Sequence, residues 1–312
     1  MCRIAYCCPF VPPELISACR LQPWPVIPRA SCRVRGLTSV AGVCPYARAF
    51  VGEVLGNPDL RGVIVTTRCD QMRRAADLLS EAKQLPVFLL NVPRTWQTQS
   101  AQVLYRSEIA RLARFLAELG NCTPSNDVLA ESIRQYAHRR NFQNGSACSA
   151  SAGASGVTAG RSSNGRVPLA LVGGPLLWEH FALFDLVSAC GGSILIDATE
   201  SGERSMPGPI DESRLALSPL NELARMYFDV IPDVFQRPGT RLLDWLEGRI
   251  RERQVRGLIV HRYMWCDLWH AEVGRLRSRF DLPLLDLDSG DEDGPNTARM
   301  TTRVQAFLEA LQ

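Results

Sequence analysis

The sequence predicts an α/β protein made of two doubly wound parallel sheets. Short apolar runs rich in β-branched residues recur in both halves, which is typical of strands buried on both faces. Longer segments with helical spacing lie between them, and strands that alternate with helices are typical of parallel sheets. Residues 143–165 are mostly Gly, Ser, Ala, Asn and Thr, with too few apolar groups to offset the entropy of ordering. We therefore predict an N-terminal α/β domain over residues 1–142, a flexible linker over 143–165 and a C-terminal α/β domain over 166–312.

Composition and charge argue against several classes of protein. The chain has 312 residues, enough for two domains of ordinary size, and its hydrophobic fraction of 46% is typical of a globular protein. No apolar stretch approaches the ~20 residues of a membrane span, and the first residues lack the apolar core of a signal peptide. The formal net charge of +3, from 35 basic and 32 acidic residues, gives no electrostatic reason to expect nucleic acid. We expect a cytoplasmic protein with neither a membrane nor a nucleic-acid partner.

The first half carries clear signals for where its elements begin and end. Proline is tolerated in a first helical turn, which favours helices that begin near Pro13 and Pro45. Gly120 is placed to stop a long helix, and Ser125 or Asn126 is placed to cap the next one. The predicted elements are, in order, a helix from Pro13, an edge strand over 24–28, a helix from Pro45, a strand over 62–65, a helix through 75–79, a strand over 86–90, and helices over 100–119 and about 126–140.

The second half repeats this alternation of strands and helices. Its first apolar run ends at the glycine loop Gly173-Gly174-Pro175, whose spacing lacks the fingerprint of a phosphate-binding loop. The predicted elements are, in order, a strand over 168–172, a helix through 183–187, a strand over 193–197, a helix over 242–253, a strand from Gly257, a strand over 282–288 and a helix over 297–311.

Two Cys-Asp pairs follow two of the predicted strands. Cys69 follows the strand over 62–65, and Cys266 follows the strand that starts at Gly257, which suggests a pseudo-repeat of the two halves. In open α/β sheets the carboxyl ends of the strands form the edge where ligands bind. A helix N-terminus at the same place favours the thiolate form of a cysteine, which is the form that ligates metals.

A third cysteine has a similar setting. Cys44 precedes Pro45 at a predicted helix start, and the 25 positions from Cys44 to Cys69 are enough for one helix and one strand. Both thiols are therefore able to return to one edge of the sheet. We also expect Asp70 and Asp267 to cap the helices that they begin.

Eleven cysteines is a raised number for a cytoplasmic chain of this length. In a reducing compartment such residues are more often metal ligands or redox groups than members of disulfides. A free cysteine taken alone, however, is most often a small buried hydrophobic residue. A metal-binding role therefore needs several cysteines that act together.

Six segments in this order resemble the 2-hydroxyacyl-CoA dehydratase family, which includes subunits of 2-hydroxyglutaryl-CoA dehydratase, benzoyl-CoA reductase and the double-cubane cluster proteins. The resemblance covers nearly the whole chain except the linker. It implies two flavodoxin-like domains with an oxygen-sensitive [4Fe-4S] cluster in the cleft between them. The segments that carry it are Cys8–Ile16, Cys44–Arg48, Thr67–Arg74, Leu89–Arg94, Cys266–Asp267 and Leu285–Asp291.

The resemblance also implies a set of site residues. Cys44, Cys69 and Cys266 fall on the three positions that ligate the cluster in the family. Three thiolates rather than four leave one iron open to water or to a substrate oxygen. Cys8 lies at another recurrent family position, and its role is open between helper and bystander. His261 and His270 flank Cys266 in sequence and are candidates to protonate a leaving hydroxyl, with side-chain packing as the alternative for both.

The function that the resemblance implies is that of an iron–sulfur subunit of a lyase. Such a subunit dehydrates an (R)-2-hydroxyacyl-CoA to an enoyl-CoA by a radical route, after one-electron reduction by an ATP-dependent iron–sulfur activator. A paralogous subunit or a second copy of the chain would complete a dimer. Two alternatives stay open: an ATP-coupled low-potential reductase of the benzoyl-CoA reductase or double-cubane type, and a non-catalytic iron–sulfur scaffold. The chain is shorter than typical members of the family, which leaves open whether it retains an acyl-CoA pocket.

Overall fold

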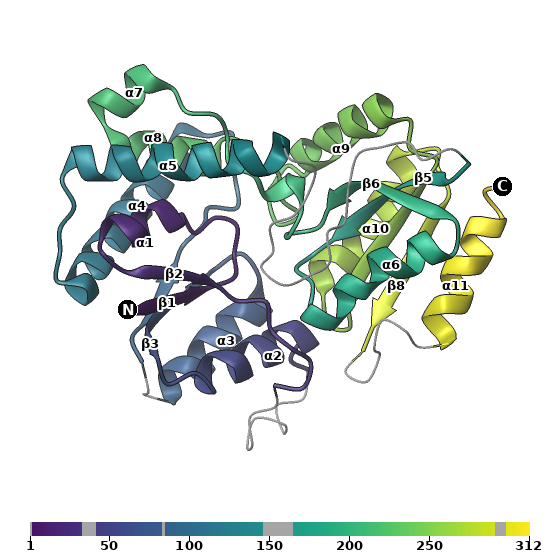
Figure 1. Cartoon of the computed structure of the whole chain (residues 1–312), viewed down its shortest axis with the longest axis horizontal. Helices are drawn as coiled ribbons and strands as arrows, with labels where there is room; N and C mark the ends of the chain where they lie inside the picture. The colour runs from purple at the N-terminus through teal and green to yellow at the C-terminus, as the bar shows by residue number, and fades with distance from the viewer. Residues whose placement is uncertain (1, 33–41, 83–84, 146–164, 291–297) are drawn as a thin grey trace.

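The computed structural model describes residues 2–32, 42–82, 85–145, 165–290 and 298–312. It contains two parallel four-stranded sheets that follow one another along the chain (Figure 1). The predicted fold class is therefore confirmed. The strands of the first sheet are β1 (Arg3–Tyr6), β2 (Gln22–Pro25), β3 (Leu60–Thr66) and β4 (Val87–Leu90), and those of the second are β5 (Val167–Gly173), β6 (Gly192–Ala198), β7 (Gly257–Tyr263) and β8 (Leu284–Ser289).

The two sheets have the same strand order. The first runs β2-β1-β3-β4 and the second runs β6-β5-β7-β8. In each sheet the first and third strands are central, the second strand lies at the edge beside the first, and the fourth lies at the other edge beside the third. This is the order of a flavodoxin-like sheet. The two Cys-Asp pairs follow β3 and β7, which are the third strand of each half. The repeat suggested by the Cys-Asp motifs is thus also a repeat of topology.

Helices cover both faces of each sheet. Alternate residues of a strand point to opposite faces, and Val63 and Val65 of β3 pack with α2 and α3 while Ile64 packs with α1 and α4. The second sheet packs one face on α6 and α11 and the other on α9 and α10. The helices are α1 (Pro13–Ala18), α2 (Pro45–Leu55), α3 (Asp70–Glu81), α4 (Gln99–Gly120), α5 (Asn126–Gly145), α6 (Ala182–Ala189), α7 (Glu212–Leu217), α8 (Pro219–Phe228), α9 (Thr240–Arg253), α10 (Asp267–Arg279) and α11 (Ala298–Glu309).

Helices α7 and α8 come from the second half of the sequence but pack on the first. They lie beside α4 and α5 in Figure 1, and Leu215, Leu223 and Met226 are buried in the same core as Leu116 of α4. The ring of Phe228 stacks on that of Tyr105 with their centroids 4.9 Å apart. The predicted boundary at residue 166 therefore separates the two sheets, but residues from both sides of it share one hydrophobic core.

Several predicted boundaries differ from the observed ones by a few residues. The edge strand expected over 24–28 is β2, which spans Gln22–Pro25. Helix α4 includes Gly120 and ends at Asn121, whose φ of 49° is left-handed, while Ser125 accepts a hydrogen bond from the Val128 N–H at 3.3 Å. Helix α5 continues to Gly145, so the first residues of the predicted linker are helical. The remainder of that linker, residues 146–164, lies outside the described residues.

Across the ranges that the structure describes, no helix combines the length and the apolar character that a bilayer crossing requires.

Candidate functional site

The candidate site begins where the two central strands of each sheet end. In both sheets the connections that follow the first and third strands cross to opposite faces of the sheet. This change of direction between neighbouring strands opens a crevice at their carboxyl ends. Cys7 and Cys8 directly follow β1, Cys69 lies three residues after β3, and Cys266 lies three residues after β7. Each sheet therefore brings cysteines to its own crevice.

The carboxyl edges of the two sheets face one another. Leu177, which follows β5, and Tyr263, the last residue of β7, are buried in the core formed by α2 and α3 of the first sheet. The ring of Tyr263 lies 6.2 Å from that of Tyr46 in α2. Residues that follow the strands of both sheets therefore border one interior region.

Cys44, Cys69 and Cys266 are the N-cap residues of α2, α3 and α10. In each case the cysteine carbonyl accepts a hydrogen bond from the residue four positions later, at 3.1, 3.0 and 2.9 Å. The first-turn amides also lie near the sulfur atoms and lower the pKa of each thiol, although none makes a side-chain cap hydrogen bond. The prediction that each of these thiols lies at a helix N-terminus is confirmed.

The three thiols lie near enough to interact electrostatically. The pKa of Cys44 is raised to about 12, mainly by burial and with smaller contributions from Cys266 and Cys69. Burial likewise raises the pKa of Cys266 to about 11 and raises that of Cys69. The free thiols are therefore protonated at neutral pH, and a metal that bound them would displace the protons.

The three N-cap cysteines supply thiol donors but do not form a site for a single metal ion. Within the described ranges, no group of three His, Cys, Asp or Glu side chains is placed to hold one metal ion. In an iron–sulfur cubane each thiolate binds a different iron, so its ligands stand farther apart than those of one ion. Buried thiols that face helix N-termini are the donors that such a cluster requires.

Cys7 and Cys8 add two more thiols beside this region. Burial raises the pKa of Cys7, whose thiol is hydrogen bonded to the hydroxyl of Tyr46, and raises that of Cys8 to about 11. Cys8 is also hydrogen bonded to Thr66, the last residue of β3. The sequence analysis gave a possible role to Cys8 and none to Cys7. The position of both residues at the end of β1, beside the crevice, is the signal that would have identified Cys7.

A buried charge network joins the two sheets beside the thiols. Arg68, which precedes Cys69, forms an ion pair with Glu200 and another with Asp233 at 2.7 Å. Arg204 lies on the other side of Asp233 at 2.8 Å and is completely buried. No local sequence pattern indicates this network, because the two carboxylates lie 132 and 165 positions from Arg68.

The network supplies positive charge close to the sulfur atoms. Arg68 lowers the pKa of Cys7, Cys8, Cys69 and Cys266, in each case against a larger effect of burial. Burial alone would raise the pKa of Asp233, but Arg68 and Arg204 hold it below its usual value. The two arginines therefore remain paired, and the site keeps a fixed cation beside the thiols.

The two candidate histidines have different environments. His261 is buried on β7, and its Nε2 lies 3.0 Å from the hydroxyl of Ser289, while its Nδ1 has no partner among the described residues. Burial lowers the pKa of His261 well below its usual value, so the ring is neutral. Its ring lies 4.9 Å from that of His180, whose Nδ1 is 2.9 Å from the Tyr263 hydroxyl. His270 is exposed on α10.

The predicted capping role of the aspartates is wrong. Asp70 and Asp267 occupy the first helical position of α3 and α10, and the N-cap positions belong to Cys69 and Cys266. A carboxylate in the first turn still interacts favourably with the helix dipole. The cysteines take the N-cap position because the chain turns from strand to helix at these residues.

An unusual turn precedes Cys266. Trp265 has a φ of 66°, in the left-handed region, and the Cys266 N–H donates to the Tyr263 carbonyl at 3.1 Å. Glycine is the residue that usually occupies such a turn position, because a side chain is strained there. The indole of Trp265 is 55% exposed. The strained turn therefore fixes the path by which Cys266 leaves β7 and enters α10.

Comparison with known proteins gives one family and one curated relative. The family described as 2-hydroxyglutaryl-CoA dehydratase, D-component, matches residues 8–147 and 146–311. Subunit alpha of the (R)-2-hydroxyglutaryl-CoA dehydratase of Acidaminococcus fermentans is 32% identical over 100 residues, which are 30% of this chain. That match spans 20% of the length of the relative.

Solved structures match only distantly. The SBP FpvC from Pseudomonas aeruginosa in complex with Mn²⁺ is 12% identical, with a TM-score of 0.27 over 100% of this chain and 99% of that one. The same protein in complex with Ni²⁺ is 11% identical, also with a TM-score of 0.27, over 100% of this chain and 97% of that one. The family match, in contrast, covers every strand of the two sheets except β1 and includes all three N-cap cysteines. The chain therefore belongs to the family of 2-hydroxyglutaryl-CoA dehydratase D-components.

Proposed function

We propose that this chain is the iron–sulfur subunit of a 2-hydroxyacyl-CoA dehydratase-like enzyme. Cys44, Cys69 and Cys266 would hold a [4Fe-4S] cluster between the two sheets, and Cys8 is the candidate for an additional contact. The observation that carries the proposal is that these three thiols begin three helices, from both halves of the chain, at the place where the two crevices meet. When bound, a cluster with three protein ligands supplies low-potential electron transfer and one iron open to an oxygen ligand.

The chain's own residues provide the environment that such a group requires. Cys44 is buried and Cys69 and Cys266 are partly buried, and the three helix N-termini and Arg68 offer positive charge to thiolates that would otherwise repel one another. The ion pairs of Arg68 with Glu200 and Asp233 also link the two halves of the chain beside the thiols. His261 and His270 remain the candidate proton donors, and of the two only His270 is exposed, since the ring of His261 is buried and neutral.

The proposed reaction is the loss of water from an (R)-2-hydroxyacyl-CoA to give an enoyl-CoA. A separate ATP-dependent iron–sulfur activator would supply the single electron that the radical route needs, and a paralogous subunit or a second copy of the chain would complete the enzyme. The family name and the name of the curated relative support a dehydratase-type component. We place this reaction in the cytoplasm, where thiols stay reduced.

A second candidate function is that of an ATP-coupled low-potential reductase of the double-cubane type. Cys7 and Cys8 favour it, because two further buried thiols border the same interior region and interact with Arg68. The iron content distinguishes the two candidates, since a bridged pair of cubanes shared by a dimer has a different stoichiometry and spectrum.

The deciding experiment is anaerobic purification with measurement of iron, sulfide and the visible absorption spectrum. Wild type should hold about four irons and four sulfides per chain, as expected for one cubane. Cys44→Ala, Cys69→Ala and Cys266→Ala should each abolish the charge-transfer absorption, whereas Cys190→Ala, at the end of α6, should leave it unchanged. The proposal fails if wild type reconstituted without oxygen binds no iron.

A further inference from the structure

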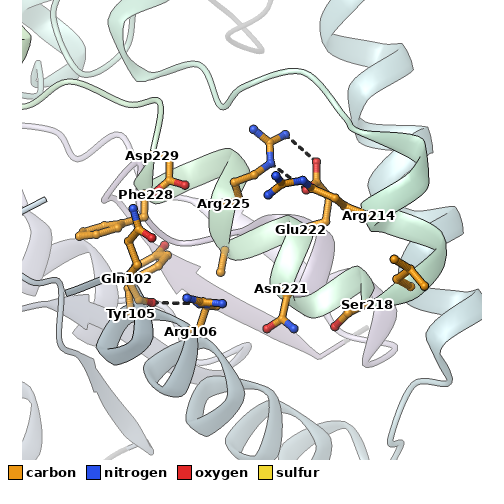
Figure 2. A pocket seen from close by; sticks show the side chains of 12 residues that line it. Gln102, Tyr105, Arg106, Arg214, Ser218, Asn221, Glu222, Arg225, Phe228 and Asp229 are labelled. Carbon is orange, nitrogen blue, oxygen red and sulfur yellow. Dashed lines mark hydrogen bonds and ion pairs between the residues drawn. The ribbon is translucent and has the colours of Figure 1, made fainter. Parts of the chain in front are cut away.

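A cavity lies away from the thiols, among the helices that cover the first sheet. It has a volume of about 220 Å³ and is enclosed by α4, α7 and α8. Figure 2 shows Arg106 of α4 and Asn221 of α8 facing one another across it, with Arg214 and Arg225 along the same side as α8. None of its lining residues belongs to the thiol site described above.

Three arginines line the cavity, and one of them forms no ion pair with any residue that the structure describes. Arg225 is held by Glu222 at 2.6 Å, and Arg214 lies 3.3 Å from Asp211. The Nε of Arg106 donates to the Gln102 carbonyl at 3.3 Å, but its two terminal nitrogens make no hydrogen bond or ion pair with any residue that the structure describes. Arg106 therefore presents the open end of a planar guanidinium fork to the cavity, and such a fork matches the oxygens of a phosphate.

The charges around the cavity leave a small positive excess. Burial raises the pKa of Asp229, and four arginines oppose that effect, in the order Arg241, Arg225, Arg106 and Arg214. Counted with Asp211 and Glu222, which neutralise Arg214 and Arg225, three carboxylates face four guanidinium groups. Arg106 forms no ion pair with a described residue, and Asp229 adds one negative group that weakens the attraction of the cavity for an anion without cancelling it.

The wall of the cavity also separates it from the thiols. The ring of Tyr105 stacks on that of Phe228. The Tyr105 hydroxyl donates at 2.8 Å to the carbonyl of Phe10, a residue that follows Cys8 by two positions. The ring of Phe10 packs edge-on against Phe235 at 5.6 Å. The aromatic layer thus closes the inner end of the cavity and makes it a separate site.

We propose that this cavity binds the phosphate end of a small phosphorylated molecule, with Arg106 as the principal anion ligand. The side chain of Asn221 and the hydroxyl of Ser218, at the start of α8, line the cavity and add neutral donors. The volume suits a phosphate or diphosphate group rather than a whole cofactor, so the rest of a larger ligand would extend through the opening. Phosphate binding at this cavity does not require a cluster, so this proposal can be tested independently of the proposed function.

Calorimetric titration of the full chain with inorganic pyrophosphate tests the proposal. Arg106→Gln should weaken binding at least about tenfold, because it removes a charge-assisted contact. Asp229→Asn should tighten binding, because it removes a carboxylate that repels the probe. Arg114→Gln is the matched control, since Arg114 is exposed further along α4 and outside the cavity, and should leave affinity unchanged.

The same titration with coenzyme A identifies the source of the phosphate. Binding that depends on Arg106 would connect the cavity to the acyl-CoA chemistry proposed above, whereas Arg106-dependent binding of pyrophosphate alone would place the cavity outside that reaction. Absence of binding of both probes to wild type, or equal losses in Arg106→Gln and Arg114→Gln, would overturn the proposal. Circular dichroism of each variant shows whether it remains folded.

Discussion

At the scale of the residue, Arg68 connects more of the site than any side chain identified from the sequence. It stands next to Cys69, contacts two carboxylates that belong to the second half of the chain, and is 8% exposed. Buried ion pairs gain little net stability over apolar contacts, but the loss of one partner leaves an uncompensated buried charge. Arg68 is thus both a structural link between the sheets and the fixed cation beside the thiols.

We expect Arg68→Ala to lower the free energy of unfolding by about 3 kcal/mol, because Glu200 and Asp233 lose a buried partner. Arg74→Ala is the matched control, since its ion pair with Asp77 is exposed and has an N···O distance of 4.0 Å. That change should cost no more than about 0.5 kcal/mol. Urea denaturation of both variants measures the difference, and equal effects would contradict the role assigned to Arg68.

The strained turn at Trp265 gives a second test at the residue scale. Alanine keeps the side-chain strain of the left-handed conformation, while glycine removes it. Trp265→Gly should therefore be more stable than Trp265→Ala by about 1 kcal/mol, the reverse of the usual order of these residues. Thermal unfolding of the two variants compares them directly, and a more stable alanine variant would mean that the turn relaxes without cost.

At the scale of the element, α8 connects the two halves of the chain through its packing against the first sheet's helices. It follows the second strand of the second sheet by sequence but completes the core of the first, where Leu223 and Met226 are fully buried. Its contacts with α4 also form the cavity that we assign to a phosphate. Helix α8 therefore ties the two halves together and shapes a candidate binding site.

Leu223→Ala should destabilise the protein by about 3 kcal/mol, because the removed methyl groups leave a cavity in a closed core. Leu217→Ala is the control, because Leu217 is the last residue of α7 and is 84% exposed, so its loss should have almost no effect. Hydrogen exchange should show the loss of protection in α4 and β1 of the first half as well as in α8. Protection lost only within α8 would contradict its place in that core.

The ion pair between α5 and α7 predicts a dependence on pH. A hydrogen bond from Arg134 lowers the pKa of Glu212, so the pair contributes above the unfolded pKa of the carboxyl group and is lost as the pH falls through the lowered folded value. Arg134→Gln should return the pKa of Glu212 toward its ordinary value, which an NMR titration of that carboxyl measures. An unchanged titration would mean that the two side chains do not pair in solution.

At the scale of the whole molecule, two sheets of identical order present their crevices to one another. The arrangement brings Cys44 and Cys69 from the first half and Cys266 from the second to one interior region. A ligand that binds these residues together would cross-link the halves in the folded state only, and such binding stabilises folding. The proposed cluster is therefore also a structural connection between the sheets.

Removal of iron should lower the midpoint of thermal unfolding of the proposed iron-loaded protein. Cys69→Ala should unfold at the same temperature with and without iron in the reconstitution mixture, because it lacks one of the three ligands. Anaerobic differential scanning calorimetry makes the comparison. Equal midpoints for iron-loaded and iron-free wild type would show that the cluster does not join the two halves.

Local signals in the sequence are sufficient to predict the α/β class, most of the strands and the helix starts at the three cysteines. These features depend on local signals: apolar runs such as Gly62–Val65, proline after Cys44, and the turn from strand to helix at Cys69 and Cys266. Local spacing was insufficient for the caps, because Asp70 and Cys69 are adjacent and only the backbone conformation decides which of them begins the helix.

The tertiary structure alone decided which distant residues meet. The pairing of Arg68 with Asp233 spans 165 positions, and the packing of α8 on α4 crosses from one half of the chain to the other. Both depend on how the two sheets and their helices bury apolar surface together, which no local pattern of residues specifies. Local sequence signals thus predict the elements and the positions of the thiols. Long-range packing determines which charges surround the thiols and forms the cavity between α4, α7 and α8.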